Sequence, residues 1–241
     1  MTADLRLGMI TPSSNTILEP MTAEILAEVP EISFHAARIR VTEISLGDGS
    51  VGQFDDSPML AAADMLADAK VSAICWNGTS ASWLGGERDR QLVQRIGETI
   101  GVPGSSAVLS TLDAMGALGE TKYGLVTPYI PTVQQRIVEN FVAEGLSCVS
   151  ERHLDISENF AFAEVSEATV EKMIREVAAE GAKVVIVLCT NVAGARLAER
   201  LERELDIVLL DSVSVSLWGA LNAAGSEQGK RLTGWGRLFS L

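Results

Sequence analysis

Cys189 stands at a point in the sequence where a thiol could take part in catalysis. It follows the apolar run Val184–Leu188 and precedes a segment with helical periodicity, which predicts that it lies between a strand and a helix. The positive end of a helix dipole lowers the pKa of a nearby thiol. Such a cysteine is suited to act as a nucleophile or a proton donor. The alternative is that Cys189 packs as a small hydrophobic side chain.

Polar residues also follow three other apolar runs, in segments 11–16, 76–83 and 127–131. A strand end that leads into a helix offers free N–H groups and a positive dipole, which together suit the binding of a carboxylate. Each segment could equally be an ordinary turn or helix cap. The candidate binding residues in the four segments are Ser13, Ser14, Asn15, Gly78, Thr79, Ser80, Tyr129, Thr190 and Asn191.

The elements that position these residues follow from the alternation of apolar runs with amphipathic segments. Continuous runs rich in Val, Ile and Leu, separated by helical patterns, are typical of parallel sheets covered by helices on both faces. The predicted strands are Leu5–Thr11, Ser33–Arg40, Ser72–Trp76, Tyr123–Thr127, Ser147–Leu154, Val184–Leu188 and Ile207–Leu210. The predicted helices are Glu19–Glu28, Met59–Ala69, Arg88–Ile100, Ala107–Leu118, Val133–Glu144, Val165–Glu180, Gly194–Glu204 and Val213–Ala223.

An internal repeat divides the chain into two similar parts. The run Gly8–Pro12 (GMITP) recurs as Gly124–Pro128 (GLVTP), and the strand ending near Gly78 has a counterpart ending near Cys189 at almost the same offset. We therefore predict an α/β protein of two similar Rossmann-like halves, each a parallel sheet flanked by helices, related by pseudo-two-fold symmetry. The active site is expected between them, because ligands bind beyond the carboxyl ends of strands in such sheets. Residues 1–115 with 213–241 are expected to form the first half, and 116–212 the second.

Composition narrows the class of protein. The 241 residues carry a net charge of −13, which disfavours nucleic acid as a partner, and the apolar runs are too short to span a membrane. Three cysteines without a C-x-x-C motif, and no signal-peptide pattern at the start, favour a reducing, cytoplasmic location. Two histidines, with no Cys/His cluster, provide little for a metal site or a Ser-His-Asp triad. Common dinucleotide and P-loop motifs are missing too.

The segments described above resemble the aspartate/glutamate racemase superfamily, in the branch of maleate cis-trans isomerases and arylmalonate decarboxylases. The resemblance covers essentially the whole chain and includes the segments 12–16, 78–80, 127–129, 189–191 and the closing 234–239. It implies catalysis without a metal or an organic cofactor, on a small-molecule carboxylate. It also implies two cysteines, one from each half, on opposite sides of the substrate. Members of the superfamily often associate, so a homo-oligomer is possible.

The sequence departs from that two-cysteine pattern. Cys189 matches the cysteine of the second half, but Gly78 stands at the position of the first. Arylmalonate decarboxylases show this same combination. The resemblance then implies that Thr79, Ser80 and Tyr129 form an oxyanion cradle for an enediolate, which Cys189 protonates on one face.

Other positions resemble the maleate isomerases instead: Asn15, Asn159, and Thr190 with Asn191 after the cysteine. The leading hypothesis is a cofactor-free decarboxylase of a malonate-type or similar small dicarboxylic acid. The alternatives are an isomerase or racemase of a small dicarboxylate or amino acid, including a role in ectoine breakdown, and a dicarboxylate-binding protein without catalysis.

Overall fold

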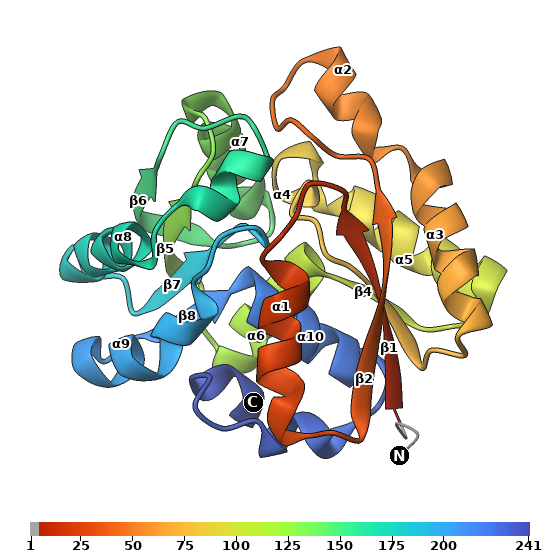
Figure 1. Ribbon diagram of the computed structural model, residues 1–241. Coiled ribbons are helices and arrows are strands. Elements are labelled where there is room, and N and C mark those ends of the chain that lie inside the picture. Colours follow the sequence, from red (N-terminus) through yellow and green to blue (C-terminus); the bar gives the residue numbers. More distant parts are fainter. Residues whose placement is uncertain (1–4) are drawn as a thin grey trace.

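The computed structural model describes residues 5–241, and it contains two four-stranded parallel sheets. In Figure 1 the first sheet lies on the right and the second on the left. The strand orders are β2-β1-β3-β4 and β6-β5-β7-β8, so the two sheets have the same topology. The strands are β1 (Leu5–Pro12), β2 (Ile32–Ile39), β3 (Ala73–Trp76), β4 (Gly104–Ser106), β5 (Lys122–Thr127), β6 (Ser147–His153), β7 (Val184–Val187) and β8 (Val208–Asp211).

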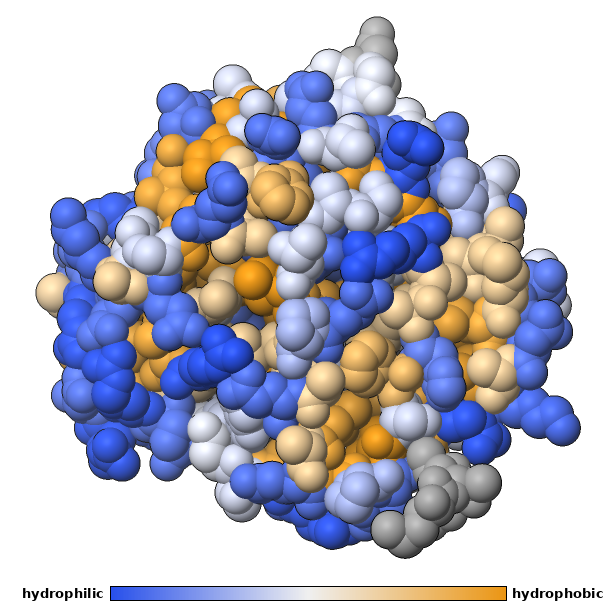
Figure 2. All heavy atoms as spheres, in the orientation of Figure 1, coloured by the Kyte–Doolittle hydropathy of each residue, from blue (hydrophilic) through white to orange (hydrophobic). Residues whose placement is uncertain are grey.

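Helices cover the sheets because the central strands are apolar on both faces. Every residue of β3 and β7 is buried, as expected for strands inside a parallel α/β sheet. Figure 2 shows polar and charged residues over much of one outer face, with hydrophobic residues between them. The helices are α1 (Leu18–Ile25), α2 (Asp48–Val51), α3 (Asp56–Asp68), α4 (Ala81–Leu84), α5 (Gly86–Ile100), α6 (Ala107–Leu118), α7 (Pro131–Ala143), α8 (Glu167–Ala179), α9 (Ala198–Leu205) and α10 (Ser212–Ala223).

The internal repeat corresponds to a shared packing requirement. A Cβ atom built on Gly8 in β1 would lie 3.1 Å from Ile74 Cγ1, and one on Gly124 in β5 would lie 2.8 Å from Ala182 Cβ. Each glycine lies in the second strand of its sheet. At both positions neighbouring side chains come so close to the backbone that a larger residue would collide with them. The predicted fold of two similar α/β halves is confirmed.

Several elements differ from the sequence prediction. Strand β4 was missed because its three residues, Gly-Ser-Ser, carry no apolar signal; backbone pairing of Gly104 with Ile74 defines it. The short helices α2 and α4 were missed because a single turn leaves no periodicity. Helix α8 begins at Glu167, not Val165, because Ser166 is its N-cap and accepts a hydrogen bond from the backbone N–H of Thr169.

Helix α10 returns to the first sheet after the second sheet is complete. It packs against α6, β3 and β4, and ten of its residues, Ser212–Leu221, are buried. This packing is compatible with assigning 213–241 to the first half, although the exact boundaries stay a prediction. Within residues 5–241 the helices are too short or too polar to cross a lipid bilayer.

Candidate active site

Loops from both sheets enclose a narrow cavity, with about 20 Å³ of space for a water-sized molecule, where the carboxyl ends of the strands meet. That volume is far below the roughly 300–1,000 Å³ of sites for drug-sized molecules. The cavity combines polar groups with an apolar wall. Its lining residues are Pro12, Val41, Ile44, Phe54, Gly78, Thr79, Ser80, Trp83, Tyr129, Asn159, Cys189 and Thr190.

Thr79 and Tyr129 form one of the polar contacts that join the two halves at this cavity. The Tyr129 hydroxyl lies 2.6 Å from Thr79 Oγ1, and both side chains are buried. Packing fixes the phenol ring: Trp83 and Phe162 contact it edge-to-face, with ring centroids 5.2 and 5.4 Å away. The cavity therefore contains hydroxyl donors held in place before any substrate binds.

Cys189 lies two residues after the end of β7, with only 3% of its surface exposed. Burial raises the pKa of its thiol to about 12, while its interactions with the Tyr129 hydroxyl and the backbone N–H of Asn191 (3.4 Å from Sγ) act in the opposite direction. The thiol is therefore protonated at neutral pH. The prediction that a helix dipole lowers this pKa is wrong, because a turn and a short 3₁₀ segment follow Cys189 and α9 begins only at Ala198.

Asn15 connects the β1 loop to the β7 loop through Thr190, which lines the cavity. Asn15 donates from Nδ2 to Thr190 Oγ1 (3.1 Å), and Thr190 donates in turn to the carbonyl of Asn77 (2.8 Å). The Asn15 carboxamide oxygen accepts from the backbone N–H groups of Ile17 and Leu18 at the start of α1. Asn15 is thus placed to hold the loops together.

Asn191 and Asn159 make a second set of connections between the halves. Asn191 accepts from the backbone N–H of Thr16 (2.9 Å) and donates to the carbonyl of Asn159 (2.6 Å). Asn159 donates from Nδ2 to Ser14 Oγ at 2.8 Å. Its backbone also donates to the Thr42 carbonyl, where segments 41–44 and 157–159 run side by side next to the cavity.

The predicted site residues therefore fall into two groups. Those that line the cavity are Gly78, Thr79, Ser80, Tyr129, Asn159, Cys189 and Thr190. Those that are not in the lining but tie the surrounding loops together are Ser13, Ser14, Asn15 and Asn191; Ser13 and Ser14 both hydrogen-bond to Val41.

Sequence reasoning missed the apolar wall of the cavity. Val41, Ile44 and Phe54 come from the connection between β2 and α3, which has no regular period to reveal which side chains point inward. Trp83 ends the candidate segment 76–83 found in the sequence, and that position was the only signal available for it.

Trp76 occupies the space into which a side chain at Gly78 would extend. A Cβ atom built on Gly78 would lie 2.0 Å from Cζ2, 2.5 Å from Cε2 and 2.7 Å from Cη2 of the Trp76 indole. Real Cβ atoms essentially never come within 3.0 Å of another heavy atom. Trp76 is completely buried and packs edge-to-face on Phe54, so its ring has little freedom to move aside.

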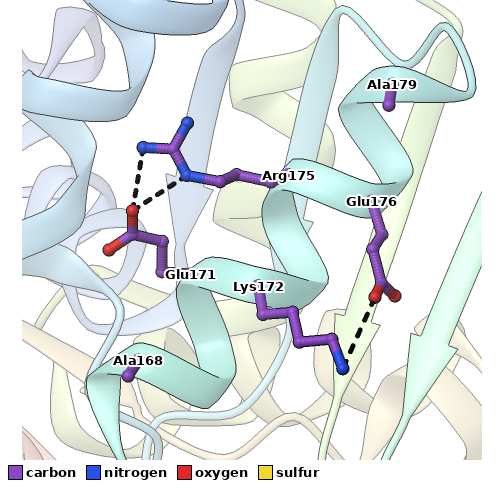
Figure 3. Close-up of a pocket in the computed structure, with 6 residues that line it drawn as sticks. All are labelled: Ala168, Glu171, Lys172, Arg175, Glu176 and Ala179. Carbon is purple, nitrogen blue, oxygen red and sulfur yellow. Dashed lines mark hydrogen bonds and ion pairs between the residues drawn. The ribbon is translucent and has the colours of Figure 1, made fainter.

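A wider hollow lies elsewhere, on the outer face of α8, and Figure 3 shows it. Its charged side chains pair with one another: Arg175 with Glu171 at 2.8 Å and Lys172 with Glu176 at 3.9 Å. These exposed pairs along one helix are typical of a solvated surface. The cavity between the halves is therefore the stronger candidate for chemistry.

Comparison with known proteins places almost the whole chain in one family. The family model described as arylmalonate decarboxylase matches residues 7–239. The chain belongs to the arylmalonate decarboxylase family. This confirms the resemblance found in the sequence.

The relatives of this chain are named for two different activities, maleate isomerase and arylmalonate decarboxylase. A maleate isomerase of Nocardia farcinica is 25% identical over 228 residues, covering 90% of this chain and 89% of its own length. The arylmalonate decarboxylase of Bordetella bronchiseptica is also 25% identical, over 238 residues, covering 97% and 95%. The maleate isomerase Iso of Pseudomonas putida S16 shares the fold, with a TM-score of 0.89, 21% identity and 98% of each chain covered.

Proposed function

We propose that this protein is a cofactor-independent decarboxylase of a malonate-type or similar small dicarboxylic acid. The observation that carries the proposal is that one thiol, Cys189, lines the cavity. Cys75 is fully buried within β3 and Cys148 lies on β6, and neither is among the lining residues. A reaction that needs one proton donor on one face of its substrate suits this arrangement.

The proposed reaction begins with one carboxylate held by hydroxyl groups of Thr79, Ser80 and Tyr129. The second carboxylate faces the apolar wall formed by Val41, Ile44, Phe54 and Trp83, where a charged group is poorly solvated and loss of neutral CO2 is favoured. The bond between this carboxylate and the central carbon breaks, and its electron pair enters an enediolate. The hydroxyl donors stabilise the negative charge that collects on the enediolate oxygens.

The enediolate carbon then takes the proton from the Cys189 thiol, and water returns a proton to the resulting thiolate. The high pKa of this thiol supports the order of events, because the group is protonated when the carbanion forms. A proton delivered from one fixed side chain yields one enantiomer when the central carbon is prochiral.

A second candidate function is isomerisation of a small dicarboxylate such as maleate, or racemisation of a related amino acid. It is favoured by the polar side chains of Asn159 and Thr190 in the cavity lining and by the maleate isomerases among the relatives. The single thiol in the lining, with Gly78 where the resemblance places a second cysteine, argues against it.

Proton NMR of the purified protein in D2O tests these candidates together, with phenylmalonate, methylmalonate, maleate and aspartate as the panel. A deuterated monoacid from a malonate supports the decarboxylase. Fumarate from maleate, or deuterium entering aspartate without release of CO2, contradicts it and supports the isomerase or racemase. Saturable binding of a dicarboxylate without any turnover contradicts both and indicates a binding protein.

A further inference from the structure

We infer that Trp76 is a specificity-determining residue: its indole ring keeps position 78 free of any side chain and so holds the site to a single proton-bearing thiol. The inference rests on the proposed function for its meaning, since it concerns which side chains face the substrate. Its steric part stands on geometry alone. Gly78 lines the cavity, and Trp76 lies against the side of Gly78 where a Cβ would project.

The steric conflict is severe because three atoms of one rigid ring are involved. All three, Cζ2, Cε2 and Cη2, belong to the six-membered ring of the indole, and all lie within 2.7 Å of the constructed Cβ. A flexible side-chain end could swing away from such a contact, but a planar ring buried in the core has no space to enter. Cysteine, serine or alanine at position 78 therefore requires that Trp76 change first.

The position of Trp76 in the fold explains why its ring is fixed. The residue ends β3, where it pairs with Ile10 of β1 and Ser106 of β4. Its side chain is completely buried, and Phe54 packs edge-to-face on it with ring centroids 6.5 Å apart. Phe54 itself lines the cavity and also packs on Trp83, 6.0 Å away. The ring is therefore part of an aromatic cluster that supports the cavity wall.

One consequence is that Gly78→Cys alone does not create a two-thiol site in this chain, although the glycine stands where the resemblance places a cysteine. A thiol introduced there collides with the indole before it reaches the substrate. The change that opens the position is Trp76→Phe, because phenylalanine lacks the distal indole atoms that the Cβ would meet. We expect positions 76 and 78 to tolerate substitution as a pair and not independently.

The test is a double-mutant cycle read by thermal unfolding, which needs no substrate. Gly78→Ala is made in the wild-type chain and in the Trp76→Phe background. We expect Gly78→Ala to lower Tm by about 4 °C or more in the wild-type chain, and by less than half of that amount beside Trp76→Phe. Equal losses in both backgrounds overturn the inference. Gly97→Ala in α5 is the matched control, because nothing lies within 4 Å of a Cβ there and this change should not lower Tm.

The functional arm compares Gly78→Cys with the double variant Trp76→Phe/Gly78→Cys on phenylpropionate-type acids in D2O. We expect exchange of the α-hydrogen to rise at least tenfold in the double variant over the single one. Exchange that is equally fast in the single variant overturns the inference. If wild-type protein decarboxylates no malonate while the Tm cycle still shows coupling, the proposed function fails and the steric pairing of Trp76 and Gly78 holds.

Discussion

The hydroxyl groups of Thr79 and Tyr129 meet 2.6 Å apart, although the two residues follow strands of different sheets. Thr79 comes after β3 and Tyr129 after β5, so the contact exists only when the halves are assembled. The same phenol lines the cavity together with Cys189, and its hydroxyl counteracts the burial that raises the pKa of that thiol. One side chain thus connects the proposed cradle to the proposed proton donor.

Tyr129→Phe tests that connection. Removing the hydroxyl takes away a donor to the enediolate, so kcat on the best malonate should fall about 100-fold, the size typical of one lost oxyanion-hole donor. The free energy of unfolding should fall by only about 1 kcal/mol, because one hydrogen bond is lost. The control is Tyr123→Phe, another buried tyrosine, which packs on Phe141 outside the cavity lining. Equal kcat values for the two variants contradict the role given to Tyr129.

Cys189→Ala tests the proton donor directly. We expect turnover to fall at least 1,000-fold, consistent with the loss of a general acid, with far-UV circular dichroism unchanged. Cys148→Ala is the control, since this half-buried cysteine lies on β6 away from the cavity, and it should retain wild-type kcat. Activity above a tenth of wild type in Cys189→Ala shows that another group delivers the proton.

Asn191→Ala should weaken the junction between the halves. The change leaves the Thr16 N–H and the Asn159 carbonyl without the carboxamide that now binds them. Buried polar groups without partners are costly, so the free energy of unfolding measured with urea should drop by about 2–3 kcal/mol. Asn222→Ala, at an exposed position on α10, should change it by less than about 0.5 kcal/mol. A small effect at Asn191 shows that water replaces the carboxamide.

Stability should fall as pH rises between 5 and 8. Burial raises the pKa values of Asp211 and Asp89 to about 7, so the folded protein holds these two protons more tightly than the unfolded chain does. For such groups the stabilising contribution is complete below the unfolded pKa of about 4 and is lost as pH rises through 7, at up to about 1.4 kcal/mol per pH unit for each group.

Asp211→Asn isolates one of these groups in urea unfolding at pH 5 and pH 8. Asparagine keeps the acceptor for the N–H groups of Val213 and Ser214 that cap α10, but does not titrate. The loss of stability over this range should shrink by about 2–3 kcal/mol. Asp64→Asn, at an exposed site on α3, should leave the loss unchanged. An undiminished loss in Asp211→Asn means that Asp211 is already ionised in the folded protein at pH 5.

The fold was predictable from the sequence because its signals are local and repeated. Apolar runs located most strands, and the glycines at positions 8 and 124 marked the equivalent strand of each sheet. The loops after those strands could be chosen because parallel strands end at one edge. Three features were beyond reach: the apolar wall from segment 41–54, the contact of Trp76 with Gly78, and the direction of the Cys189 pKa. Each depends on which side chains contact one another in the folded protein. Residue spacing along the sequence does not predict those contacts.

The return of α10 to the first sheet also sets an order of events during synthesis on the ribosome. Strands β5–β8 and helices α7–α9 are contiguous in the chain, so the second sheet and its helices can assemble as soon as they emerge. The first sheet emerges earlier, yet the faces of β3, β4 and α6 that α10 covers stay open to solvent until residues 212–223 appear. The first half, although synthesised first, is thus the last to complete its fold. We expect chaperones to bind the apolar surface that it exposes until then.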